Sequence, residues 1–116
     1  MLRKMLKSKI QYAKITAKNL KYTGSITIDR SLMDKADLYA GEMVLIANLN
    51  NGARFETYVI EGKRGSGVIG LNGAAARLGE IGDELIIMSY LFVDDVSAKK
   101  CEPVLLFLNN NNRPGK

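Results

Sequence analysis

The sequence contains no histidine, no tryptophan and only one cysteine in 116 residues. Without an imidazole, the chain cannot use Ser-His-Asp or Cys-His catalysis, His-ligated zinc or the usual proton shuttle of neutral-pH enzymes. Cys101 can neither form an intramolecular disulfide nor complete a tetrahedral metal site by itself. We therefore interpret Cys101 as a small buried or half-buried apolar residue, and we expect no metal site.

Apolar runs long enough for the core of a signal peptide or for a membrane span are also missing. Residues 1–10 are interrupted by Arg3, Lys4, Lys7 and Lys9. We therefore expect a cytoplasmic protein that has no membrane partner.

The composition is that of one folded domain, with 47% hydrophobic and 25% charged residues. A chain of this length can bury a core without disulfides or metals. The formal net charge of +5 suits a nucleic-acid partner, and it equally suits a site for a small anionic substrate. Composition does not distinguish these two alternatives.

Hydrophobic periodicity predicts strands along most of the chain. The expected strands are residues 9–15, 25–29, 43–49, 55–60, 68–71, 84–92 and 104–108. Short helices are expected over 30–37, 74–78 and 94–100, the first with Asp29 as its N-cap. This pattern is typical of a small, mainly β barrel over residues 1–108. The polar segment 109–116 contains Pro114 and Gly115 and is expected to be a disordered tail.

Two short glycine-containing patterns are open to functional interpretation. Residues 65–70 spell G-x-G-x-x-G, but strand-like residues follow where a dinucleotide site needs a helix, so we interpret the segment as a hairpin turn. Residues 49–54 resemble residues 71–77. The similarity predicts two related strand-turn units whose equivalent turns meet near one site.

The pair Gly24-Ser25 opens a predicted strand and, taken alone, indicates an ordinary turn. Its surroundings favour another interpretation, because five separated segments match one family in the right order. These are residues 5–10, 22–29, 51–60, 65–67 and 72–77, which read MLKSKI, YTGSITID, NGARFETYVI, GSG and NGAAAR. Over residues 1–108 the chain resembles the pyruvoyl-dependent aspartate 1-decarboxylases.

The resemblance implies a mainly β fold, a double-psi β-barrel with short helices, assembled as a homotetramer. It also implies a proenzyme that cuts itself between Gly24 and Ser25 into residues 1–24 and 25–116. Ser25 would then become a covalent pyruvoyl group, the cofactor for converting L-aspartate to β-alanine and CO2 in pantothenate biosynthesis. Whether a maturation factor assists the cleavage is left open.

The resemblance also implies roles for individual residues. The Ser25 hydroxyl attacks the Gly24 carbonyl, whose oxyanion contacts Thr57, and Tyr58 protonates the product carbon. Arg54 and Lys9 supply positive charge for substrate carboxylates. The remaining expected substrate-binding residues are Tyr22, Thr57, Asn72, Gly73, Ala74 and Ala75.

Two details of the sequence complicate these roles. Thr57 and Tyr58 are adjacent in a predicted strand, so their side chains should point to opposite faces, which different pockets across a subunit boundary would explain. Gln11 stands where many family members have histidine, and a glutamine cannot titrate. Thr23 replaces a frequent valine.

Two alternative functions follow from the same residues. In the first, the chain is a non-enzymatic β-barrel module that binds nucleic acid through its basic N-terminal face, with an affinity that falls steeply as the salt concentration rises. In the second, the chain has a related fold that has lost its enzymatic activity. The enzyme is the favoured interpretation, and it requires no nucleic-acid partner.

Overall fold

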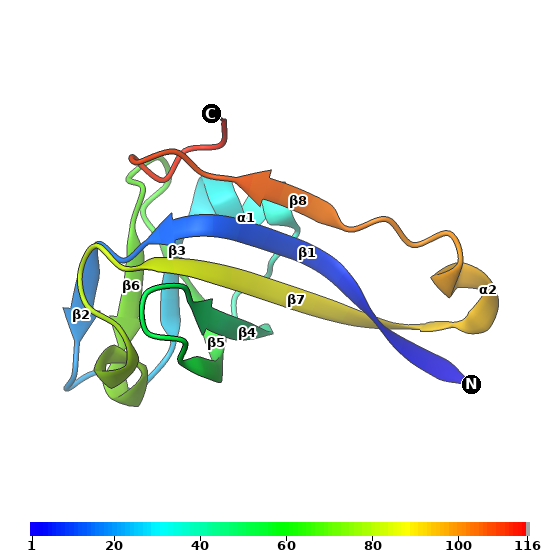
Figure 1. Ribbon diagram of the computed structural model, residues 1–116, viewed down its shortest axis with the longest axis horizontal. Helices are drawn as coiled ribbons and strands as arrows, with labels where there is room; N and C mark the ends of the chain where they lie inside the picture. The colour runs from blue at the N-terminus through cyan, green and yellow to red at the C-terminus, as the bar shows by residue number, and fades with distance from the viewer. Residues whose placement is uncertain (116) are drawn as a thin grey trace.

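The computed structural model describes residues 1–115. Its eight-stranded sheet has the order β2-β6-β3-β5-β4-β7-β1-β8, which confirms the expected mainly β class (Figure 1). The strands are β1 (Leu2–Lys14), β2 (Ala17–Asn19), β3 (Ile26–Asp29), β4 (Met43–Asn48), β5 (Arg54–Gly62), β6 (Ile69–Asn72), β7 (Glu84–Asp94) and β8 (Val104–Phe107). The helices are α1 (Arg30–Ala36), the 3-10 helix η1 (Gly73–Leu78) and α2 (Asp95–Ala98). None of the helices within residues 1–115 is long and apolar enough to cross a membrane.

The sheet curls around the core because the segment of residues 2–19 pairs with strands near both edges of the sheet. Strand β1 pairs antiparallel with β7 and parallel with β8. Just beyond it, the Thr16 amide donates to the Ile69 carbonyl of β6 at 2.8 Å, and β2 then pairs parallel with β6. Strand alternation turns β-branched residues inward. The fully buried set includes Ile10, Ile15, Ile26, Ile28, Ile46, Ile69, Leu71, Leu85 and Ile87.

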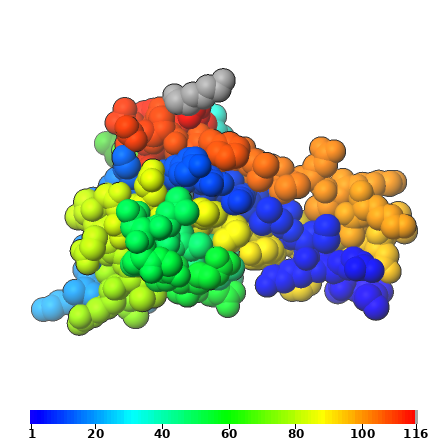
Figure 2. Space-filling view, viewed as in Figure 1, coloured from blue at the N-terminus to red at the C-terminus, as the bar shows by residue number. Residues whose placement is uncertain are grey.

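Strands β1 and β7 continue beyond the barrel as a projecting arm, which we define as residues 1–6 and 90–103. Figures 1 and 2 show this arm, with the N-terminus and α2, extending to one side of the molecule. Large apolar side chains on the arm face solvent, with Leu2 68% and Phe92 67% exposed. Such a surface is typical of an interface with another protein chain.

The junction of β3 and α1 is held by Asp29, as the N-cap prediction requires. Its buried carboxylate accepts hydrogen bonds from the amides of Ser31 (2.8 Å), Gly65 (2.9 Å) and Gly67 (2.8 Å). Residues 65–67 therefore form a turn, but the expectation of a hairpin is wrong. Strand β3 lies between β5 and β6, so the turn joins two strands that do not pair with each other.

The C-terminal segment differs from the expected disordered tail. Asn112 is buried, and its side chain accepts from the Lys14 amide and donates to the carbonyls of Lys14 and Gly67, each at 2.8 Å. The Asn109 side chain accepts from the Asn111 amide at 2.9 Å. Asparagine amides replace backbone partners here, so a polar composition is compatible with an ordered turn. Lys116 lies outside the described residues.

Candidate active site

The backbone between β2 and β3 is strained at Gly24 and Ser25. Gly24 has φ +99° and Ser25 has φ +106°. A positive φ costs little at glycine, but at serine it places Cβ in a sterically unfavourable position. Ser25 is also completely buried. The strain therefore falls on Ser25, directly after the expected cleavage bond, while Gly24 adopts its positive φ at little cost.

Asn72, at the end of β6, holds Ser25 by both its backbone and its side chain. The Asn72 amide donates to the Ser25 carbonyl at 3.0 Å. Its side-chain Nδ2 donates to the Ser25 hydroxyl at 2.9 Å and to the Thr27 hydroxyl at 2.9 Å. The Ser25 oxygen accepts from Asn72, which leaves its own proton free to be given up. Asn72, expected to bind substrate, thus contacts the serine that is the expected nucleophile.

A pocket of about 270 Å³ opens at this serine. Its lining comes from the β2–β3 connection, β5 and the β6–η1 turn, and consists of Gly24, Ser25, Phe55, Glu56, Thr57, Asn72, Ala74, Ala75 and Leu78. One protomer therefore brings together six of the expected residues, namely Gly24, Ser25, Thr57, Asn72, Ala74 and Ala75. The pocket thus places the buried Ser25 hydroxyl beside a concave surface of a size that suits a small ligand.

Comparisons with known proteins show the family of this chain. A family model described as aspartate decarboxylase matches residues 1–114. The chain belongs to the aspartate decarboxylase family. An aspartate 1-decarboxylase from Thermoanaerobacter pseudethanolicus is 55% identical over 114 residues, which cover 98% of this chain and 97% of that protein. The aspartate 1-decarboxylase of Syntrophomonas wolfei is 58% identical over 112 residues, covering 97% of this chain and 95% of that protein.

A solved structure supports the fold prediction. The rationally designed mkDPBB_sym_86 protein, a double-psi β-barrel, superposes with a TM-score of 0.50 at 13% identity. The match covers 70% of this chain and 94% of the designed chain. At this identity the likeness concerns the fold alone, and it confirms the double-psi β-barrel expected from the family resemblance.

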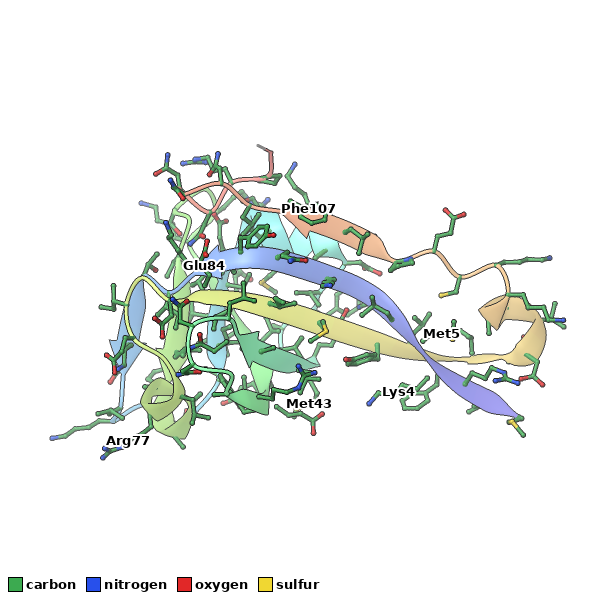
Figure 3. All side chains as sticks on the ribbon, viewed as in Figure 1. Lys4, Met5, Met43, Arg77, Glu84 and Phe107 are labelled. Atoms are coloured by element: carbon green, nitrogen blue, oxygen red, sulfur yellow. The ribbon has the colours of Figure 1, made fainter. Side chains whose placement is uncertain are left out.

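Five residues expected from the family resemblance lie outside the pocket lining, namely Lys9, Tyr22, Arg54, Tyr58 and Gly73. Thr57 and Tyr58 pair with consecutive residues of β4, Val44 and Met43, so β5 has no bulge between them. Their side chains therefore point to opposite faces, as expected. Figure 3 labels Met43, the ladder partner of Tyr58, on β4.

Lys9, Arg54 and Tyr58 share what we call the outer sheet face, which also carries Leu45 and Met88. One row of ladder partners runs Lys9, Met88, Leu45, Glu56 across β1, β7, β4 and β5. The next row on the same face runs Gln11, Ile86, Ala47, Arg54. Two cations of the expected substrate site thus occupy a surface opposite the core residues Ile10 and Ile46.

Gly73 is buried beside Gly24 rather than exposed in the pocket. Four other residues of the site were not expected from the sequence: Phe55, Glu56 and Leu78 line the pocket, and Thr27 accepts from Asn72. Phe55 and Thr27 each lie two positions from an expected residue of the same strand face, Thr57 and Ser25 respectively. Strand alternation therefore contained the signal for both.

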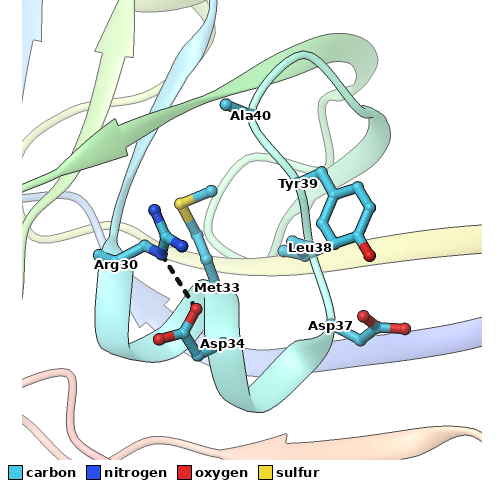
Figure 4. Close-up of a pocket in the computed structure, with 7 residues that line it drawn as sticks. All are labelled: Arg30, Met33, Asp34, Asp37, Leu38, Tyr39 and Ala40. Atoms are coloured by element: carbon cyan, nitrogen blue, oxygen red, sulfur yellow. Dashed lines mark hydrogen bonds and ion pairs between the residues drawn. The ribbon is translucent and has the colours of Figure 1, made fainter.

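Other pockets of the molecule have a different chemistry. Figure 4 shows one of about 320 Å³ beside α1, where Arg30 Nε donates to Asp34 Oδ1 at 3.0 Å. The hydrogen bond to Asp34 raises the pKa of Arg30, and the same bond lowers the pKa of Asp34. None of the described residues that line this pocket is serine, threonine or cysteine. Arg30 and Asp34 are paired with each other, and the lining offers no serine, threonine or cysteine for an acyl shift of the expected kind.

Proposed function

We propose that this chain is a self-processing aspartate 1-decarboxylase, which converts L-aspartate to β-alanine and CO2 in pantothenate biosynthesis. The observation that carries the proposal is the buried Ser25 at φ +106°, whose hydroxyl is held by Asn72. The names of the family and of the relatives specify the reaction. The site adds a strained backbone at Ser25 and a Ser25 hydroxyl that Asn72 holds in place. These two features would allow the chain to make its own electrophile without a histidine.

Self-cleavage requires only groups of the chain and one water molecule. The Ser25 oxygen attacks the Gly24 carbonyl carbon, a C–O bond forms, the Gly24–Ser25 C–N bond breaks, and the serine nitrogen becomes a free amine. Loss of the Ser25 α-proton then expels the ester oxygen as the Gly24 carboxylate and leaves dehydroalanine. Water hydrolyses that group, ammonia departs, and a pyruvoyl ketone remains. Thr57 lines the same pocket and is the proposed donor to the oxyanion.

The residues around Ser25 fit a pyruvoyl group at that position. When formed, this ketone supplies an electron sink for loss of the substrate carboxylate. The surrounding pocket contains the small side chains of Ala74 and Ala75, which leave space for an amino acid next to residue 25. The buried position of residue 25 keeps bulk water away from the reacting atoms.

The groups that bind the substrate carboxylate and the group that donates the proton come, we propose, from the outer sheet face of a second copy. Lys9 and Arg54 would hold the carboxylate, and the Tyr58 phenol would protonate the product carbon. Tyr22, which is 48% exposed close to Gly24 in sequence, would line the entrance. Half-buried Leu45 and Met88 lie between the charged residues of this face, and the projecting arm exposes further apolar side chains. Both features support assembly, and we propose the homotetramer of the family.

We propose a cytoplasmic enzyme that uses neither nucleic acid nor a membrane as partner. Its dependence on a maturation factor is decided by timing the cleavage of purified chain alone. Completion without any other protein would show that the factor is not required.

The decisive experiment is intact-mass analysis of the purified protein together with CO2 release from labelled aspartate. We expect one fragment that ends at Gly24 and a larger one that begins with pyruvoyl, and Ser25→Ala should remain uncut and inactive. An unbroken wild-type chain after prolonged incubation would contradict the proposal. Salt-dependent binding to DNA or RNA by that unbroken chain would favour the nucleic-acid module instead.

A further inference from the structure

Gly73 lies in tight backbone contact with the segment that precedes the cleavage bond. Its φ is +66°, and a Cβ added there would lie 2.6 Å from the Gly24 nitrogen, 2.7 Å from the Gly24 Cα and 2.8 Å from the Tyr22 carbonyl oxygen. All three atoms belong to the main chain. No flexible side chain can therefore move aside, and a methyl group at position 73 must displace residues 22–24 themselves.

The space around Gly24 is quite different. A Cβ added at Gly24 would meet nothing within 4 Å, although its φ is +99°. The steric fit at this bond is therefore determined by Gly73. The small side chains of residues 73–75 therefore leave room for the backbone of residues 22–24 as well as for an approaching ligand.

Asn72 and Gly73 act on the two sides of the same peptide bond. Asn72 holds Ser25 through its carbonyl and its hydroxyl, and Gly73 supports Gly24 from behind. We propose that Gly73 is a positioning residue for self-cleavage, which fixes the Gly24 carbonyl relative to the Ser25 hydroxyl. This inference rests on the proposed function, because it concerns the step that makes the pyruvoyl group.

The step is sensitive to such a shift because the nucleophile and the carbonyl are neighbours in the chain. The hydroxyl must approach the carbonyl carbon along one direction, and displacement by about 1 Å can cost about 100-fold in rate. A side chain at residue 73 would move Gly24 while Asn72 continues to hold Ser25. The acyl shift to the ester should then be the step that slows.

The test compares Gly73→Ala with Gly52→Ala in freshly synthesised full-length chain, with cleavage followed by intact mass. Gly52 has φ +76° and open space around an added Cβ, so alanine there carries the same backbone strain without the collision. We expect Gly73→Ala to cut about 100-fold more slowly than wild type and Gly52→Ala to stay within about threefold. Hydroxylamine, which cleaves esters, should release fragment 1–24 from wild type and Gly52→Ala faster than from Gly73→Ala.

Thermal unfolding of both variants separates positioning from a loss of folding. Gly73→Asn is the second variant, because asparagine tolerates a positive φ better than alanine does but still carries the Cβ. Wild-type cleavage rates in folded Gly73→Ala or Gly73→Asn would overturn the inference. Failure of both to fold while Gly52→Ala folds would assign Gly73 to the fold alone and also overturn it. An uncut wild-type chain would instead remove the proposed function.

Discussion

At the scale of single residues, the Asn72 amide organises the site by using both of its protons. Its side-chain nitrogen donates one hydrogen bond to the Ser25 hydroxyl and one to the Thr27 hydroxyl, each at 2.9 Å. The two acceptors lie two positions apart, Ser25 directly before β3 and Thr27 within it. The orientation of the nucleophile thus depends on a side chain that is itself anchored at a second point.

Asn72→Asp should impair self-cleavage, because a carboxylate cannot donate to either hydroxyl. We expect the cleavage rate to fall about tenfold or more, since a lost buried donor costs about 1–3 kcal/mol. Thr27→Val removes the second acceptor but keeps the Ser25 contact, so it should slow cleavage less. Intact-mass time courses of the two variants measure both rates. Equal rates in Asn72→Asp and wild type would contradict this role of the amide.

The sequence predicts these residues unevenly, for physical reasons. Gly24, Ser25 and Thr57 are identified by the family resemblance, and the structure brings them to one pocket. The role of Gly73 is not contained in any motif, because a close backbone approach depends on the three-dimensional path of residues 22–24. The separation of Tyr58 from Thr57 was expected from strand alternation, whereas the positions of Lys9 and Arg54 outside the pocket lining were not.

At the scale of elements, Asp29 connects the end of β3 to the turn of residues 65–67. Burial alone would raise the pKa of Asp29, but hydrogen bonds from Gly67, Ser31 and Gly65 together lower it below its ordinary value. The folded state therefore binds the Asp29 proton less tightly than the unfolded state. The resulting stabilisation is present above the unfolded pKa of about 4 and is lost as pH falls through the lower folded value.

Asp29→Asn should reduce the free energy of unfolding by about 1–3 kcal/mol at neutral pH, because an amide nitrogen cannot accept these bonds. The difference between the variant and its parent should shrink below about pH 4. Denaturant unfolding in the uncut Ser25→Ala background provides the measurement. A difference that stays constant down to pH 2 would contradict the pKa assignment.

The turn of residues 109–115 shows where composition misleads. Its asparagines predict disorder when counted, yet Asn112 is buried and bonded to the backbone of Lys14 and Gly67. Most strands and helices were predictable because their periodicity is local, although β2 and the first residues of β1 were not expected. This turn was not, since its partners lie far away along the chain.

Asn112→Ala should therefore destabilise the protein by about 1–3 kcal/mol, because it leaves buried backbone groups of Lys14 and Gly67 without partners. Asn110→Ala is the matched control. Asn110 is exposed, and among residues 1–115 its side chain bonds only the Lys14 ammonium, at 3.0 Å, so its loss should cost less than about 0.5 kcal/mol. Chemical unfolding of the two variants should separate them clearly, and equal midpoints would indicate a loosely attached tail.

At the scale of the whole molecule, the two halves of the proposed chemistry lie on different surfaces. The residues for cleavage line one pocket of a single protomer, while Lys9, Arg54 and Tyr58 lie on the outer sheet face. Cleavage should therefore be a property of the protomer, and decarboxylation a property of the assembly.

Leu45→Lys places a charge in the middle of the outer sheet face and should disrupt assembly. We expect smaller species in analytical ultracentrifugation and loss of CO2 release, while the cut between Gly24 and Ser25 still occurs. Ile81→Lys is the control, because Ile81 is 64% exposed in the loop before β7. Full decarboxylation by a monomeric Leu45→Lys variant would rule out a site shared between copies.

The position of β1 determines whether the protein can refold after the proposed cut. This strand is hydrogen-bonded on one side to β7 and on the other to β8, yet it would belong to the fragment that ends at Gly24 after the proposed cut. After the proposed cut, the smaller piece cannot leave without tearing the sheet apart. Folding of the intact chain is a unimolecular event, whereas reassembly after the cut needs two separate molecules to meet. The covalent link between the two fragments would thus assist folding only once, before the cut. Mature protein that has been fully denatured should regain its fold at a rate that depends on protein concentration.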